Sequence, residues 1–127
     1  GIPLHINISG KELSYEIKVS PGCSVLIPSG IKIDVPYGQS LVFMNKSGVC
    51  TKQKLFVGAQ VIDHGYQGEV HFHMINSSSH TVYIKPGQKI VQGLLIPVPD
   101  IKVTEIKENL FLQESARGDG GFGSTGL

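Results

Sequence analysis

Short runs of alternating apolar and polar residues, separated by glycine and proline, restrict the fold of this chain more than any other feature. In the clearest run, Ile31, Ile33 and Val35 fall on one face of an extended backbone. Lys32 and Asp34 fall on the opposite face. Side chains two residues apart in a strand share a face, so this period indicates a half-buried β-strand. A proline and a glycine follow within three residues of Val35 and end the run.

Further strands are predicted on both sides of this run. Val70, Phe72 and Met74 alternate with polar residues, and Val82 and Ile84 do the same. The other β-prone stretches span residues 2–8, 16–19, 25–27 and 41–44, and a short helix fits only within 47–54. The apolar stretch 90–98 hardly alternates, as expected of a strand buried on both faces or at a subunit contact. Many short strands with at most one short helix predict an all-β, jelly-roll-like barrel or sandwich.

The chain has the length of one domain, and its charges nearly balance. Its 127 residues are 40% hydrophobic and carry a formal net charge of +1, without a run of lysine or arginine. Nonspecific binding of nucleic acid needs a basic surface, so no nucleic-acid partner is expected. We expect a barrel domain over residues 1–116, ending in a linker from residue 105, and a C-terminal arm over residues 117–127.

Cysteine usage and hydropathy bear on the compartment. Cys23 and Cys50 lie far apart in no metal-binding spacing, so we interpret them as reduced thiols. No apolar run approaches the roughly 20 residues that span a bilayer, and the first residues do not resemble a signal peptide. A soluble intracellular protein of the cytoplasm or nucleus is therefore expected, with no membrane partner, and a viral origin is compatible with this.

The arm, with the sequence RGDGGFGSTGL, is rich in glycine and poor in apolar surface. Such a segment is expected to be mobile in the free protein. Arg117 offers a two-donor fork, Ser124 and Thr125 offer hydroxyls, glycine backbones offer N–H groups, and Phe122 offers a flat face for a base. These groups suit a nucleoside polyphosphate, and a disordered glycine-rich tail is the alternative interpretation.

Two motifs, and with them nearly the whole chain, resemble the trimeric dUTPases. The stretch RGDGGFGSTG resembles the C-terminal motif of that family, which closes over bound dUTP. VGAQVIDHGYQGE, residues 57–69, resembles the third motif, usually written GVIDxxYRGE. The resemblance implies an all-β, jelly-roll-like homotrimer that hydrolyses dUTP to dUMP and pyrophosphate. It also implies three active sites, each built from motifs of different subunits.

The third motif implies the residues that hold the nucleoside. Asp63 would be the general base that takes a proton from the attacking water; otherwise it is a turn aspartate bonded to a nearby N–H. Tyr66 would pack against the sugar and exclude a 2′-hydroxyl, and its alternative is a tyrosine half-buried at a strand edge. The uracil and deoxyribose contacts are assigned to Gly58, Gln60, Val61, Ile62, Tyr66 and Phe122.

Two further motifs imply the phosphate contacts. Residues 45–48, NKSG, take the place of the second motif, most often PRSG, so a lysine supplies the charge without the arginine fork. Residues 87–92, GQKIVQ, resemble the fourth motif, GxRIAQL; the alternative for its Gln92 is a pairing with backbone. The phosphate-binding set is Lys46, Ser47, Gly48, Gln92, Arg117, Gly121, Ser124 and Thr125.

The first motif, AGYDL in the family, is the main departure. The best alignment places Gly10 to Leu13 there, so that Glu12 would hold Mg²⁺ through water in place of the usual aspartate. A second departure is Gln60, where the family usually has glycine beside the uracil; its amide would read a base edge or narrow the pocket.

Other interpretations stay open at this point. They are a dCTP deaminase, which shares the fold, a non-catalytic interaction protein, which the changes at Glu12 and Gln60 favour, and a structural β protein without a ligand. His71 and His73 point the same way from one strand. Because no third ligand is in view, we expect them on a solvent or intersubunit face and not at a metal.

Overall fold

The computed structural model describes residues 1–8, 10, 13–123 and 126. Its regular elements are short strands and one π-helical turn, η1, as the sequence predicts. In chain order they are β1 (His5–Ile8), β2 (Ile17–Val19), β3 (Ser24–Pro28), β4 (Ile31–Asp34), β5 (Gln39–Asn45), η1 (Val49–Gln53), β6 (Leu55–Val57), β7 (Val61–Asp63), β8 (His71–Asn76), β9 (Val82–Ile84) and β10 (Val91–Pro97).

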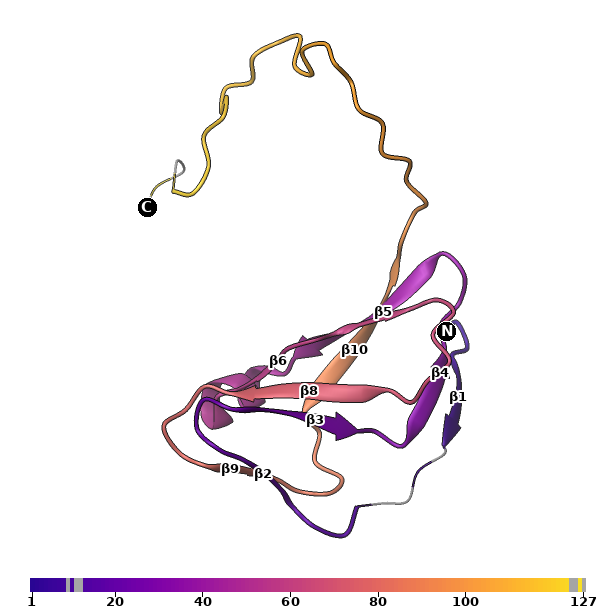
Figure 1. The fold of residues 1–127 in the computed structure, drawn as a ribbon, viewed down its shortest axis with the longest axis vertical. Helices are drawn as coiled ribbons and strands as arrows, with labels where there is room; N and C mark the ends of the chain where they lie inside the picture. Colours follow the sequence, from indigo (N-terminus) through magenta and orange to yellow (C-terminus); the bar gives the residue numbers. More distant parts are fainter. Residues whose placement is uncertain (9, 11–12, 124–125, 127) are drawn as a thin grey trace.

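The strands pair antiparallel in four small sheets that gather into one body (Figure 1). The sheets that carry the candidate site are β10-β5-β7 and β3-β8-β6, and the others are β1-β4 and β2-β9. Ser40 of β5 lies opposite Asp63 of β7, and Asn45 at the other end of β5 lies opposite Val91 of β10. Strand β5 therefore connects the third motif to the second and fourth.

Two clusters of buried side chains form the core. Leu55 and Met74 are fully buried in the first cluster, and Val70 is fully buried in the second. Phe43 and Phe72 meet edge to face, with ring centroids 5.2 Å apart, where the clusters adjoin. Removing this apolar surface from water is the main term that stabilises the barrel.

The alternation that predicted β4 is confirmed by burial. Ile33 and Val35 are buried, whereas Lys32 and Asp34 are exposed. The helical turn lies inside the predicted stretch 47–54 and ends at Gln53, and the capping residue Lys54 takes a left-handed φ of 58°. In the described part of the chain, no helix is long and apolar enough to cross a membrane. Cys23 and Cys50 are both free thiols.

Strand β10 corrects one of the two interpretations of the stretch 90–98. Leu95 is half-buried over the core, but Leu94 and Ile96 on the opposite face are exposed. The interpretation of β10 as a strand buried on both faces is therefore wrong within a single chain. The other interpretation, a subunit contact, stays a prediction.

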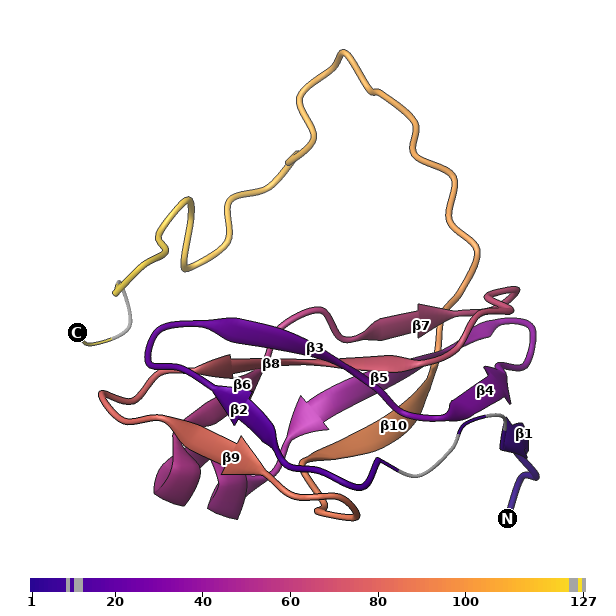
Figure 2. The same cartoon turned by 60° about the horizontal axis from the view of Figure 1, so that its bottom comes forward.

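Beyond β10 the chain leaves the barrel and arcs away from it, as Figures 1 and 2 both show. The Val98 N–H donates to the Gly38 carbonyl at 2.8 Å, and the Tyr37 hydroxyl donates to Asp100 at 3.0 Å. The extended segment thus starts near Asp100, earlier than the linker predicted from residue 105. It exposes the apolar side chains of Ile101, Val103, Ile106, Leu110, Phe111 and Leu112.

Candidate active site

The turn between β6 and β7 is held by hydrogen bonds on both of its sides. The Gly58 N–H donates to the His73 carbonyl at 2.8 Å, and the Ala59 N–H donates to Nδ1 of the His73 ring at 2.9 Å. On the other side, the Phe43 N–H donates to the Gln60 carbonyl at 2.8 Å. The turn is therefore fixed to β8 and to β5, which makes it a rigid support for a ligand.

Gly58 has a steric role in this turn. A Cβ atom built on Gly58 would lie 2.0 Å from Nδ1 of His73, so the imidazole fills the space that any side chain here would need. His73 is expected from the sequence on a solvent or intersubunit face; its ring is half-buried against the turn in the single chain, and the intersubunit part of that expectation stays a prediction. Gly58 itself supports the site without lining its cavity.

A cavity of about 300 Å³ lies beside this turn. Most of its wall is apolar, while Asp63, Tyr66 and His71 bring polar groups to it. Such a surface suits a flat ring with a few polar edges. The lining residues are Leu26, Phe43, Ala59, Gln60, Val61, Ile62, Asp63, Tyr66 and His71.

Asp63 is the last residue of β7, and its side chain is exposed at the cavity. The buried Ser40 donates its hydroxyl to Oδ1 of Asp63 across 3.4 Å, a long and weak hydrogen bond. The Asp63 carbonyl accepts the Tyr66 N–H at 3.2 Å, and Gly65 within this turn has a φ of 90°. A carboxylate has about four acceptor positions, so Asp63 is oriented and keeps capacity to accept from water.

The hydroxyl end of Tyr66 is held by a hydrogen bond and by close packing. Its hydroxyl donates to the Glu69 carbonyl at 2.9 Å. A Cβ atom built on Gly68 would lie 2.6 Å from that hydroxyl oxygen, so the ring packs directly over the glycine. Tyr66 therefore forms a rigid wall of the cavity next to Asp63.

The residues predicted to bind phosphate form a second group on the chain. Nε2 of Gln92 donates to the Asn45 carbonyl at 2.8 Å, which brings the fourth motif against the second. This backbone pairing is the alternative that the sequence left open for Gln92. Ser47 is exposed, and its carbonyl accepts the Thr51 hydroxyl at 2.8 Å at the start of η1. Lys46, Ser47, Gly48 and Gln92 do not line the 300 Å³ cavity.

The described part of the arm, residues 117–123 and 126, lies away from the barrel in Figure 1. Nε of Arg117 donates to the Gly120 carbonyl at 2.6 Å, which closes a local turn next to Gly121. Phe122 is fully exposed. The predicted site residues Glu12, Ser124 and Thr125 lie outside the described residues.

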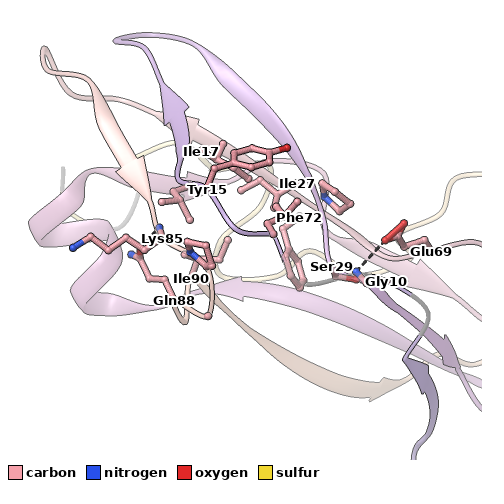
Figure 3. Close-up of a pocket in the computed structure, with 16 residues that line it drawn as sticks. Gly10, Tyr15, Ile17, Ile27, Ser29, Glu69, Phe72, Lys85, Gln88 and Ile90 are labelled. Carbon is pink, nitrogen blue, oxygen red and sulfur yellow. Dashed lines mark hydrogen bonds between the residues drawn. The ribbon is translucent and has the colours of Figure 1, made fainter.

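A larger cavity of about 480 Å³ opens elsewhere in the barrel, between β2, β3, β8 and β9 (Figure 3). It is lined mainly by apolar side chains such as Ile17, Ile27 and Phe72. Two of its polar side chains are engaged within the chain: Glu69 accepts the Gly30 N–H at 3.0 Å, and Gln88 accepts the Lys85 N–H at 3.1 Å. This cavity holds none of the described site residues predicted from the sequence.

Comparison with known proteins shows the family to which the chain belongs. Residues 12–126 match the dUTPase family model. The chain is 34% identical over 128 residues to the deoxyuridine 5'-triphosphate nucleotidohydrolase of Gloeothece citriformis, covering 98% of this chain and 86% of the relative. The chain belongs to the dUTPase family. A dUTPase-family enzyme of the same name from Hydrogenobaculum is 37% identical over 113 residues, covering 87% of this chain and 76% of the relative.

Solved dUTPase structures share the fold. Staphylococcus bacteriophage 80alpha dUTPase, solved with dUpNHpp, has a TM-score of 0.84 at 19% identity and covers 98% of this chain and 99% of its own. A dUTPase of phage phi11, whose structure describes a structural Mg(II) ion, has a TM-score of 0.73 at 16% identity, covering 87% of this chain and 100% of its own. The jelly-roll fold expected from the sequence is therefore confirmed.

Sequence reasoning missed four residues that line the cavity of this dUTPase-family chain. They come from strand β3, strand β5, the β6–β7 turn and strand β8. The alternation along β8 predicts that His71 and His73 share one face of the strand. It does not predict that this face packs against the β6–β7 turn. The missed residues are Leu26, Phe43, Ala59 and His71.

We predict that Gly58→Ala destabilises the protein, and that the same change costs less stability when His73→Ala has already removed the imidazole. The added methyl collides with the imidazole, and overpacking of this kind costs about 1 to 3 kcal/mol. Urea unfolding of the two single variants and the double variant measures it. Gly48→Ala is the matched stability control, because its added methyl meets nothing within 4 Å. A single Gly58 variant as stable as the parent contradicts the steric account.

Proposed function

We propose that this dUTPase-family chain hydrolyses dUTP to dUMP and pyrophosphate, with the nucleoside in the 300 Å³ cavity. The main support is the placement of an exposed, lightly bonded carboxylate, Asp63, at a mostly apolar cavity with a fixed tyrosine wall. A nucleobase needs the apolar wall, and the attacking water needs the carboxylate.

The walls of the cavity suggest how the nucleoside is held. Val61 and Ile62 offer apolar contact to uracil, and the rigid turn that Gly58 permits offers backbone groups to its edge. Gln60 brings an amide that reads the base or narrows the pocket. Tyr66 lies where it excludes a 2′-hydroxyl, and Phe122 covers the base when the arm closes.

Asp63 acts as general base in the proposed reaction. It takes a proton from a water that attacks the α-phosphorus in line, while the bond from that phosphorus to the bridging oxygen breaks and pyrophosphate leaves. The Ser40 hydroxyl keeps the carboxylate oriented during this step. Positioning and charge stabilisation supply most of the rate in phosphoryl chemistry.

Positive charge and hydrogen-bond donors then hold the triphosphate. Lys46 supplies charge, Ser47 a hydroxyl, and Gly48 a backbone N–H at the start of η1. Gln92 is held beside them by its bond to Asn45. The arm adds the guanidinium of Arg117, the backbone of Gly121 and the hydroxyls of Ser124 and Thr125.

Magnesium fits this site as a substrate-held ion. In the described part of the chain, no three His, Cys, Asp or Glu side chains cluster tightly enough to hold a metal. Mg²⁺ commonly keeps several waters and binds through substrate phosphates and one or two carboxylates, so a full protein cage is not needed. We propose Glu12 as the water-mediated carboxylate. When bound, Mg²⁺ neutralises phosphate charge.

The geometry of β5 supports a homotrimer with shared active sites. Ser40 beside Asp63 and Asn45 beside Ser47 are five residues apart on this strand, which separates them by about 17 Å at the rise of a β-strand. One α-phosphate cannot contact both ends. The Ser47 that serves a given Asp63 would therefore come from another copy.

The outer face of sheet β10-β5-β7 offers an apolar surface for such a contact. Met44, Val61, Leu94 and Ile96 are 41%, 54%, 49% and 39% exposed. The strand registers place Leu94 beside Val42 and Val42 beside Val61, so these side chains share one face. Covering such a face with a second copy removes apolar surface from water.

A nucleotide panel tests the proposed function. We expect pyrophosphate from dUTP with Mg²⁺, and much slower hydrolysis of UTP and dTTP, because the tyrosine wall excludes a 2′-hydroxyl and the turn leaves no room for a 5-methyl. Nearly equal cleavage of UTP or dTTP contradicts the pocket assignment. Ammonia from dCTP identifies a deaminase. No product from any of them favours the interaction protein, in which Gln60 obstructs the pocket.

We expect Asp63→Asn to lower turnover of dUTP by about a hundredfold or more while nucleotide affinity survives, because the amide keeps the shape but cannot take the proton. Steady-state kinetics and calorimetric binding measure the two quantities. Asp34→Asn, an exposed carboxylate on β4, is the matched control. Turnover of the Asp63 variant within a factor of about three of the parent contradicts the assigned role.

Deleting residues 117–127 should leave melting temperature and oligomer mass almost unchanged and abolish most turnover, because the described hydrogen bonds of the arm are local. Arg117→Ala should reproduce about a ten- to hundredfold loss, the size of one charge-assisted phosphate contact. Lys107→Ala, an exposed cation before the arm, is the control. A fully active truncated protein would mean that the arm is only a tail.

A further inference from the structure

His71 lies at the start of β8 and lines the same cavity as Asp63 and Tyr66. Its Nδ1 is 3.0 Å from the Glu69 carbonyl oxygen. A carbonyl oxygen only accepts, so Nδ1 is the ring nitrogen that carries the proton. Nε2 of the neutral ring then presents a lone pair. Within residues 1–8, 10, 13–123 and 126, Nε2 has no hydrogen-bond partner.

The ring of His71 is held beside Tyr66 by a shared acceptor. The Glu69 carbonyl accepts the Tyr66 hydroxyl at 2.9 Å as well as Nδ1 of His71. Its two lone pairs are thereby filled, and neither ring can rotate without losing its bond. His71 therefore lies next to the phenol end of the side chain that forms the wall against the sugar.

His73, two residues along the same strand, has the opposite tautomer. Its Nδ1 accepts the Ala59 N–H, so its proton is on Nε2, and its ring does not line the cavity. The two histidines thus have separate tasks: His73 holds the turn, and His71 offers an acceptor to the cavity.

We infer that His71 is a specificity-determining residue that accepts a hydrogen bond from the 3′-hydroxyl of the deoxyribose through Nε2. The inference rests on the proposed function. The nucleoside of dUTP has two donors, the 3′-hydroxyl and the uracil N3–H. His71 shares the Glu69 carbonyl with the Tyr66 hydroxyl, and Tyr66 is the side chain proposed to pack against the sugar, which favours the sugar hydroxyl. Tyr66 then tests the 2′ position of the sugar, and His71 tests the 3′ position.

The test compares dUTP with 2′,3′-dideoxyuridine triphosphate in the parent and in His71→Asn. Asparagine can still donate to the Glu69 carbonyl from the position of Nδ1, but it has no atom at the position of Nε2. We expect kcat/KM for dUTP to fall about three- to tenfold, the size of one neutral hydrogen bond, and kcat/KM for the dideoxy substrate to stay unchanged. His80→Asn, a histidine in an exposed loop outside the cavity, should alter neither value.

Two outcomes overturn the inference. One is an unchanged preference for dUTP over the dideoxy substrate in the His71 variant, whether or not both substrates slow together. The other concerns N3-methyl-dUTP. If the His71 variant loses part of the preference for dUTP over N3-methyl-dUTP but keeps the preference for dUTP over the dideoxy substrate, His71 contacts the base and not the sugar. If the parent hydrolyses no nucleotide, the proposed function fails, and calorimetric binding of dUMP and 2′,3′-dideoxyuridine monophosphate to the same variants still decides the role of His71.

Discussion

Two consecutive amides of one turn need hydrogen-bond acceptors, and a single histidine supplies both. His73 accepts the Gly58 N–H on its carbonyl and the Ala59 N–H on its ring. Without these acceptors, the turn would have to expose both amides to water. Once the turn is fixed, β7 pairs with β5, Asp63 lies opposite Ser40, and the chain turns toward Tyr66 and Glu69. The cavity follows from these constraints.

The two ends of strand β5 lead to two different parts of the candidate site. One end orients the carboxylate, and the other leads into the segment proposed to bind phosphate. A strand this long is stiff, so the ends cannot approach each other. The same sheet shows apolar side chains to solvent on its outer face. Both features are the basis for the proposal that the active sites are shared between copies.

Local sequence patterns were sufficient to predict a strand or helix whose periodicity lies within one element. The alternation of Ile31 to Val35 predicted β4, and the only helical stretch contains η1. The third-motif residues Gln60 to Asp63 and Tyr66 do line one cavity. The contacts of the two histidines could not be predicted, because His71 bonds to the loop directly before β8 and His73 bonds to a turn 14 residues away. The predicted subunit contact at β10 also involves a second copy, so a pattern within one chain does not decide it.

The apolar side chains from Ile101 to Leu112 have a consequence for how this protein keeps its fold. A single copy leaves them in water together with the outer face of β10. In the proposed homotrimer other copies would cover both, and the free energy gained would belong to the assembly and not to the barrel alone. By mass action, the resistance of such a chain to unfolding rises with its own concentration. Dilution alone then weakens the fold, even when temperature and solvent stay constant.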